Sequence, residues 1–348
     1  MALAAFACGS KQAEDDDASG PSAGRGGGGG TSGGTGVAGG SGGTTAGGAG
    51  GTSSGGAGRG GASSGGFGGN AGAAPSGVCT NAFGTPTLLI PDTPGVIPQT
   101  LSVTGDDLEL FYEEKRPDGA HLVVRTRADR NAAFGDATDL DPSISSWCPA
   151  PADPSLDVSD DGLRLYMTCV DTTTPDSNGG FPSSPIRLAE RATRGAAFSL
   201  NPSDFGIGNV SMSVSQDELT AFWSDYTMTT SPLPVTATRA SRSVPFGAPV
   251  AIPGIVDSLR NPELANDGVH LFGVLQIDNA DFHIYMFTKS QGGSFATPTA
   301  LDQVFPSGVS GSSEYTPTVS GDCNSLYFLR RTRQADGSYT DEIYAAKR

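Results

Sequence analysis

The sequence predicts an all-β fold in which five four-stranded units form a ring behind a long segment without regular structure. Three observations lead to this prediction: the distribution of glycine, five repeats at similar spacing, and the alternation of apolar and polar residues within each repeat. Of the 51 glycines in the 348 residues, 30 lie in residues 1–78. Only residues 79–348 therefore have the composition of a folded domain.

The N-terminus is a short apolar run that ends in Ala-Cys, Met1-Ala-Leu-Ala-Ala-Phe-Ala-Cys8. It resembles the end of a bacterial lipoprotein signal peptide, in which the cysteine becomes the first mature residue and carries the lipid. The resemblance implies that residues 1–8 are a signal-peptide remnant, that Cys8 is the lipidation site and that the lipid bilayer is a partner. The basic segment that usually comes first is missing, which a start codon placed too far downstream would explain. A stray cysteine in a meaningless apolar start is the alternative.

Residues 9–78 consist mostly of Gly, Ser, Thr and Ala. Such a segment cannot bury enough apolar surface to offset the entropy of ordering, so it is predicted to be a disordered linker. A coil of this length has a root-mean-square span of roughly 45 Å. We therefore expect an exported domain, tethered at the outer membrane or cell surface, or in the periplasm.

The net charge of −16 and the sequence pI near 4.4 exclude two classes of partner. No basic stripe is available to neutralise the phosphates of a nucleic acid. The same lack of basic residues disfavours binding to an anionic membrane surface through Lys and Arg.

Five segments align on an aspartate in a predicted turn. Each has an aliphatic residue three positions before the aspartate, alternation of apolar and polar residues before that turn, and an apolar run with a central aromatic after it. These features predict a hairpin, which a third strand and a Phe-Gly-like element extend to four antiparallel strands. The aligned aspartates are Asp106, Asp161, Asp217, Asp267 and Asp322.

Four-stranded units repeated around an axis are the blades of a β-propeller. Val158-Ser-Asp-Asp-Gly-Leu163 and Leu264-Ala-Asn-Asp-Gly-Val269 resemble the TolB-type, WD-like propeller repeat. The resemblance implies the fold and leaves the function open. The fifth unit lacks the Phe-Gly-x-Pro element, and an unpaired copy, Phe83-Gly-Thr-Pro86, precedes the first unit. We therefore expect the N-terminal strand of the domain to complete the last of five blades.

The blade geometry also predicts the disulfides. Turns between the first and second strands, and between the third and fourth, lie on one face of a propeller, and the remaining loops lie on the other. Cys79 and Cys323 then share one face of the last blade. Cys148 and Cys169 share the opposite face of the second. We predict Cys79–Cys323 and Cys148–Cys169, because both other pairings would cross faces. The sequence contains no Cys-x-x-Cys motif and no Cys/His cluster, so it does not predict a zinc site.

Two carboxylates are predicted near the axis. The position before each aligned aliphatic residue is Ser or Thr in three blades but Asp157 and Glu263 in the second and fourth. Two axial carboxylates could be the acid/base pair of a glycosidase or ligands of Ca²⁺, the only cofactor kept as a candidate. The simpler interpretation is that they bind water and neighbouring hydroxyls.

Aromatic residues on the loop face form a second candidate ligand site: Trp147, Trp223 and Tyr226, beside the long loop 170–185. Exposed aromatics on a rigid scaffold are typical of binding surfaces, although Trp223 is equally well explained as core. With Asp157 and Glu263 they place a ligand at the axial mouth of that face. The three histidines, His121, His270 and His283, are best explained as polar strand residues.

No motif of a known catalytic class is present in the sequence. We therefore expect a non-enzymatic role: a monomeric propeller that binds an unknown protein or glycan ligand, or acts as a scaffold, at the cell envelope. A glycoside hydrolase of the five-bladed type is the alternative.

Overall fold

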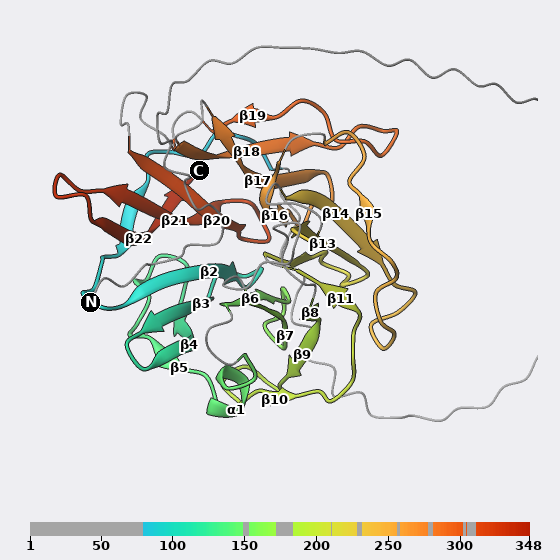
Figure 1. The fold of residues 1–348 in the computed structure, drawn as a ribbon, viewed down its shortest axis with the longest axis horizontal. Helices are drawn as coiled ribbons and strands as arrows, with labels where there is room; N and C mark the ends of the chain where they lie inside the picture. Colours follow the sequence, from blue (N-terminus) through green and yellow to red (C-terminus); the bar gives the residue numbers. More distant parts are fainter. Residues whose placement is uncertain are drawn as a thin grey trace, which may run out of the picture. The chain divides into compact units, whose positions relative to one another are not determined.

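The computed structural model describes residues 79–148, 153–171, 184–209, 211–227, 232–255, 258–277, 281–301, 304 and 311–348. Within them, five four-stranded antiparallel sheets surround a common axis, so the fold is the predicted five-bladed β-propeller (Figure 1). Cys8, the linker 9–78 and most of the loop 170–185 lie outside the described residues.

The first three blades are each continuous in sequence. From the axis outwards, blade one consists of β2 (Ile97–Val103), β3 (Glu109–Arg116), β4 (Gly119–Thr126) and β5 (Thr138–Asp139). Blade two consists of β6 (Asp153–Val158), β7 (Arg164–Val170), β9 (Arg187–Glu190) and β10 (Ser199–Leu200). Blade three consists of β12 (Ser213–Val214), β13 (Thr220–Asp225), β14 (Leu233–Thr238) and β15 (Val250–Ala251).

The last blade contains strands from both ends of the domain. Blade four consists of β16 (Arg260–Leu264), β17 (His270–Ile277), β18 (Asp281–Thr288) and β19 (Thr299–Ala300). Blade five consists of β20 (Ser312–Val319), β21 (Ser325–Arg333), β22 (Tyr339–Lys347) and β1 (Thr87–Ile90). β1 pairs antiparallel with β22, with Thr87 opposite Ala345. The predicted closure of the ring is therefore confirmed.

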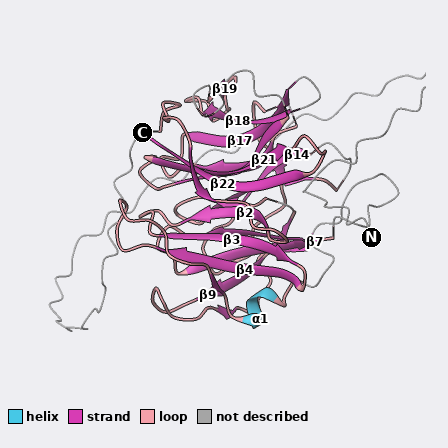
Figure 2. Ribbon diagram, turned by 90° about the vertical axis from the view of Figure 1, so that its left-hand side faces the viewer, coloured by secondary structure: helices cyan, strands magenta, loops and turns pink. Residues whose placement is uncertain are grey.

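Three short elements add to the repeat. The helix α1 (Pro142–Ser145) lies beside β4 and β10, and Figure 2 shows it at the edge of the stacked strands. β8 (Ser184–Pro185) pairs with β11 (Ile207–Gly208) as a separate two-stranded sheet. Among the described residues, no helix is long and apolar enough to cross a membrane.

The repeated aromatic of the second strand is buried in every blade, at 0–5% exposure: Phe111, Tyr166, Phe222, Phe272 and Tyr327. A blade has neighbours on both faces, so alternate residues on both sides of a strand pack into apolar cores. The second strands accordingly read as nearly continuous apolar runs. Burial of a large side chain contributes about 1.5–3 kcal/mol, and repetition in five blades makes this packing the main source of stability.

An arginine after the third strand links each of blades one to three to the preceding blade, and the sequence analysis missed it. Its Nε donates to a backbone carbonyl of the turn in its own blade at 2.6–2.7 Å. Its guanidinium lies 4.3–4.6 Å from the ring of the Phe seven residues later. The arginines are Arg127, Arg191 and Arg239, and their partners in the preceding blades are Tyr327, Glu109 and Tyr166.

Both predicted disulfides are present. Cys79–Cys323 joins the segment before β1 to the first turn of blade five, over a sequence separation of 244 residues. Cys148–Cys169 joins the entry of blade two to the end of its second strand, over 21 residues. The agreement confirms both the register of the blades and the assignment of each turn to a face.

Candidate functional site

The innermost strands surround the axis with three layers of side chains. The middle layer contains the two predicted carboxylates: Ser102, Asp157, Ser213, Glu263 and Thr318. The mouth layer lies two residues earlier in each blade, on the same side of the strand: Thr100, Ser155, Ser211, Asn261 and Thr316. The turn layer lies at the opposite end of the axis: Gly105, Asp160, Gln216, Asn266 and Gly321.

The middle layer forms a closed ring of hydrogen bonds between blades. Each of its five side chains accepts the backbone N–H of the aligned aliphatic residue in the next blade. The donors, in blade order from the Ser102 acceptor, are Val158, Val214, Leu264, Val319 and Val103. Both carboxylates therefore have a structural role, because they satisfy buried amides that would otherwise lack a partner.

Asp157 is the more enclosed of the two carboxylates, with 5% exposure. Its Oδ1 accepts the Ser102 hydroxyl at 2.7 Å, and its Oδ2 accepts the Val214 amide at 2.7 Å. Burial raises the pKa of Asp157 to about 7, against the lowering effect of these two bonds. The side chain therefore titrates near neutral pH, whereas an ordinary aspartate titrates at about pH 4.

Glu263 is half-buried and contacts the cavities on both sides of the middle layer. Its Oε1 lies 3.1 Å from the Thr318 hydroxyl. Burial, and then the negative charge of Asp157, raise the pKa of Glu263 well above its usual value. The protonated form of Glu263 is therefore favoured beside a charged Asp157.

A third carboxylate, Asp160, lies in the turn layer and was missed by the sequence analysis. It borders the same polar cavity as Asp157 and Glu263, together with Gln216 and Asn266. The Asn266 amide donates to Asp160 Oδ2 at 2.5 Å, and burial raises the pKa of Asp160. In sequence, Asp160 is the first Asp of Asp-Asp-Gly, so it was interpreted only as turn chemistry. Its signal was that no other blade has an acid in that position.

Two glycines let the turns of blades one, two and five approach one another closely. A Cβ on Gly105 would lie 2.7 Å from the Asp160 side chain, and one on Gly321 would lie 2.8 Å from the Gly105 carbonyl oxygen. The Gly321 amide also donates to that carbonyl at 2.9 Å. Only glycine allows this approach. Asp157, Asp160 and Glu263 line one small polar cavity, which the exposed Gln216 also borders.

The mouth layer combines positive backbone φ angles with unpartnered hydroxyls. Ser211, Asn261 and Thr316 have φ between 46° and 59°, where non-glycine residues are uncommon. In blades one, four and five the register shifts at this level, which is typical of β-bulges. Within the part of the chain that the structure describes, the buried hydroxyls of Thr100 and Thr316 have no hydrogen-bond partner. The layer is thus a small polar depression without a carboxylate of its own.

The predicted aromatic site is not an open surface. Trp223 and Tyr226 are 2% and 3% exposed. The second strand of a blade is covered on both faces by the neighbouring blades, which explains the burial of Trp223. Trp147 is half-buried against the core between blades one and two. The structure thus brings Asp157 and Glu263 together but assigns Trp223 and Tyr226 to packing, which corrects the prediction that they face a ligand.

One group of potential metal ligands lies elsewhere. Among the described residues, the only Cys, His, Asp and Glu side chains in which three ligand atoms lie within 4.8 Å of one another are Cys79, Asp267 and His270. The axial carboxylates do not form such a group, and the Ca²⁺ candidate stays a prediction.

Comparisons with known proteins match the fold of the chain alone. No protein family matches the sequence, and no curated protein matches it. TolB from Acinetobacter baumannii is similar in structure at 13% identity and a TM-score of 0.39, and the match spans 74% of this chain and 55% of TolB. The catalytic domain of the GH62 α-L-arabinofuranosidase of Coprinopsis cinerea is similar at 15% identity and a TM-score of 0.49, over 76% of this chain and 96% of that one.

The other similar structures correct the functional expectation. A GH43_1 enzyme from Xanthomonas citri is similar at 12% identity and a TM-score of 0.49, over 74% of this chain and 88% of that one. Most of these similar structures are glycoside hydrolases. The expectation of a non-enzymatic binding or scaffold role is therefore corrected to its glycoside hydrolase alternative, as a proposal, because the likeness itself shows the fold alone.

Proposed function

We propose that this protein is a glycoside hydrolase whose chemistry takes place in the axial cavity at the turn layer. The observation that carries the proposal is the convergence of Asp157, Asp160 and Glu263 on one small polar space. Glycoside hydrolysis requires a carboxylic acid that is protonated at neutral pH beside a carboxylate that is ionised. The raised pKa of Glu263 favours its protonated form and so supplies the proton donor.

Each carboxylate has a distinct role in this proposal. Glu263 takes the role of proton donor to the leaving oxygen, since burial and then the adjacent charge of Asp157 raise its pKa. Asp160 takes the role of the carboxylate that activates water or stabilises the developing positive charge; the Asn266 and Gln216 amides donate to it and lower its pKa, against the larger raising effect of burial. Asp157 remains bound to the middle layer and tunes Glu263 through its charge.

The first test is a screen of the purified protein against aryl glycosides and plant and bacterial polysaccharides, with and without EDTA. We expect release of phenol from at least one sugar, and a loss of kcat of at least about 100-fold in Glu263→Gln. Asp160→Asn should lower kcat as well, whereas the matched control Asp136→Asn changes an exposed carboxylate and should retain full activity.

Two outcomes would contradict the proposal. One is the absence of hydrolysis by a folded wild-type protein on the whole panel. The other is hydrolysis that Glu263→Gln and Asp160→Asn both retain at the wild-type rate. Loss of activity in EDTA that Ca²⁺ restores would support Ca²⁺, the candidate kept beside the expectation of no cofactor.

We further propose that the propeller is an exported lipoprotein with a TolB-type repeat, anchored through Cys8 and separated from the bilayer by residues 9–78. The support is the Ala-Cys run, followed by a composition that cannot form a core. Hydrolysis at the cell envelope would then act on glycans outside the cytoplasm. Two disulfides agree with an oxidising compartment, since such bonds persist mainly in exported proteins.

A further inference from the structure

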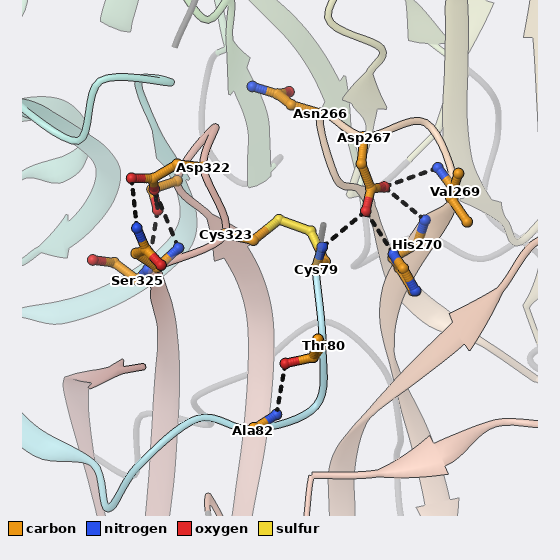
Figure 3. Close-up of a disulfide and its surroundings, with 12 residues drawn as sticks. Cys79, Thr80, Ala82, Asn266, Asp267, Val269, His270, Asp322, Cys323 and Ser325 are labelled. Carbon is orange, nitrogen blue, oxygen red and sulfur yellow. Dashed lines mark hydrogen bonds and ion pairs between the residues drawn. A yellow bond between two sulfur atoms is a disulfide. The ribbon is translucent and has the colours of Figure 1, made fainter. Parts of the chain in front are cut away.

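The Cys79–Cys323 disulfide lies beside two other side chains that commonly bind metal ions. Ligand atoms of Cys79, Asp267 and His270 lie within 4.8 Å of one another, and Cys323 is bonded to Cys79. Cys79 and Cys323 are 1% and 0% exposed, and the side chains of Asp267 and His270 are each 9% exposed. Figure 3 shows these residues converging from the segment before β1 and from the first turns of blades four and five.

The turn of blade four departs from the repeat at this place. In the other blades a Ser or Thr two residues before the aspartate donates to its carboxylate: Thr104, Ser159, Ser215 and Ser320. Blade four has Ala265 instead, and the His270 amide takes the free place at Asp267 Oδ1 at 2.9 Å.

The second oxygen of the aspartate departs as well. In blades one and five this oxygen binds an arginine, as in Asp106 with Arg194. Asp267 Oδ2 instead accepts the Cys79 amide at 3.0 Å and lies 2.6 Å from His270 Nδ1 (Figure 3). At this carboxylate oxygen, residues that can bind a metal ion, His270 and Cys79, thus take the place that an arginine occupies in blades one and five.

We propose that the disulfide is the oxidised form of a zinc site, in which Cys79, Cys323, Asp267 and His270 bind Zn²⁺ once the disulfide is reduced. Two thiolates, an imidazole and a carboxylate are ligands that Zn²⁺ takes, and four of them form the closed tetrahedral shell of a structural site. The burial of all four side chains leaves no open position for a substrate. This inference is independent of the proposed hydrolase.

The two forms interconvert by balanced steps. Two molecules of a low-molecular-weight thiol together donate two electrons and two protons, so that the S–S bond breaks, two cysteine thiols form and the two donor molecules are joined as a disulfide. Zn²⁺ then displaces the two thiol protons, which leave to solvent. In either form the segment before β1 is cross-linked to blade five, and with zinc it is also linked to blade four. The ring therefore keeps its fastening in reducing surroundings.

The experiment uses the whole protein, reduced without oxygen by a phosphine reductant, then exposed to Zn²⁺ or Co²⁺ and freed of excess metal by gel filtration. We expect one zinc per chain by elemental analysis in the reduced protein and none in the oxidised protein. Co²⁺ should give the thiolate-to-metal absorption of a tetrahedral site. Circular dichroism is recorded in every state.

Variants separate this site from adventitious binding. His270→Ala and Asp267→Asn should weaken zinc binding by the reduced protein at least about 100-fold. His121→Ala and His283→Ala serve as matched histidine controls, and the pair Cys148→Ser/Cys169→Ser as the matched cysteine control. These should bind zinc as the wild type does.

Three results would overturn the proposal. The first is a folded, reduced wild-type protein without stoichiometric zinc. The second is equal zinc binding by His270→Ala, which would place the metal elsewhere. The third is a reduced protein that loses its near-ultraviolet circular dichroism and does not regain it with zinc.

Discussion

At the scale of single residues, two acids with raised pKa values belong to the structural hydrogen-bond ring at the axis. Asp157 accepts from Ser102 and from the Val214 amide, which fixes its position. Its high pKa follows from burial, and the pKa of Glu263 follows from burial and from the charge of Asp157. The same side chains thus close the ring and provide the acidic groups of the proposed chemistry, so their two roles must be separated by experiment.

The pH dependence of stability tests the protonation of Asp157. The folded pKa is raised to about 7 from 3.8, so the folded state binds a proton that the unfolded state has lost. Stability from this group is fully present below the unfolded value and is lost as the pH rises through the folded value. We expect the free energy of unfolding to decrease by a few kcal/mol, to order of magnitude, between about pH 4 and pH 7. Urea unfolding at a series of pH values measures it.

Asp157→Asn should remove part of that decrease, since the amide keeps the shape and cannot ionise. Asp217→Asn is a control of opposite sign, because the Ser215 hydroxyl lowers the pKa of Asp217 and its stabilisation is present at neutral pH and lost in acid. A wild-type profile that is flat from pH 4 to 7, or one that Asp157→Asn leaves unchanged, would show that Asp157 is ionised throughout.

At the scale of elements, β1 and the two disulfides fix where the chain closes. In the chain-entropy model, a cross-link over 244 residues contributes about 5 kcal/mol and one over 21 residues about 3 kcal/mol. We therefore expect Cys79→Ala/Cys323→Ala to lose about 2 kcal/mol more than Cys148→Ala/Cys169→Ala. Guanidinium unfolding of the oxidised proteins measures the difference. Equal losses would mean that β1 stays paired in the unfolded ensemble or that strain cancels the entropy.

The strands were predictable because the turn aspartate and the alternation of apolar and polar residues recur in every blade. Asp161 and Asp217 with their flanking alternation predict a hairpin independently, and Phe83-Gly predicts the displaced strand because the last blade lacks one. Burial of Trp223 could not be decided from the sequence. A blade is covered on both faces by its neighbours, so period-two alternation does not distinguish a core residue from a residue that faces a ligand. A repeated role for Arg191 could have been predicted, because blades one to three each have an arginine seven residues before the Phe of the Phe-Gly-like element. Its partner Glu109 lies 82 residues away and required the ring geometry.

At the scale of the whole molecule, the N-terminal Cys8 leads to a prediction about where the acidic propeller is located in the cell. We expect full-length protein to fractionate with membranes, and Cys8→Ser to release it into the soluble fraction. A single acyl chain binds a bilayer only marginally, so stable anchoring requires the several chains that lipoproteins carry. Detergent partitioning and mass spectrometry of the N-terminal peptide measure lipidation directly. Soluble wild-type protein with an unmodified Cys8 would contradict the anchor.

The displaced strand β1 also determines the order in which the fold can be completed. Thr87 precedes its partner Ala345 by 258 residues, so the first four blades form an open arc until β22 reaches β1. Pairing at such sequence distance is slow, and an arc has two unpaired ends that resemble sheet edges. The stage before β22 pairs with β1 is therefore the one at which the folding chain is most exposed to edge-to-edge association.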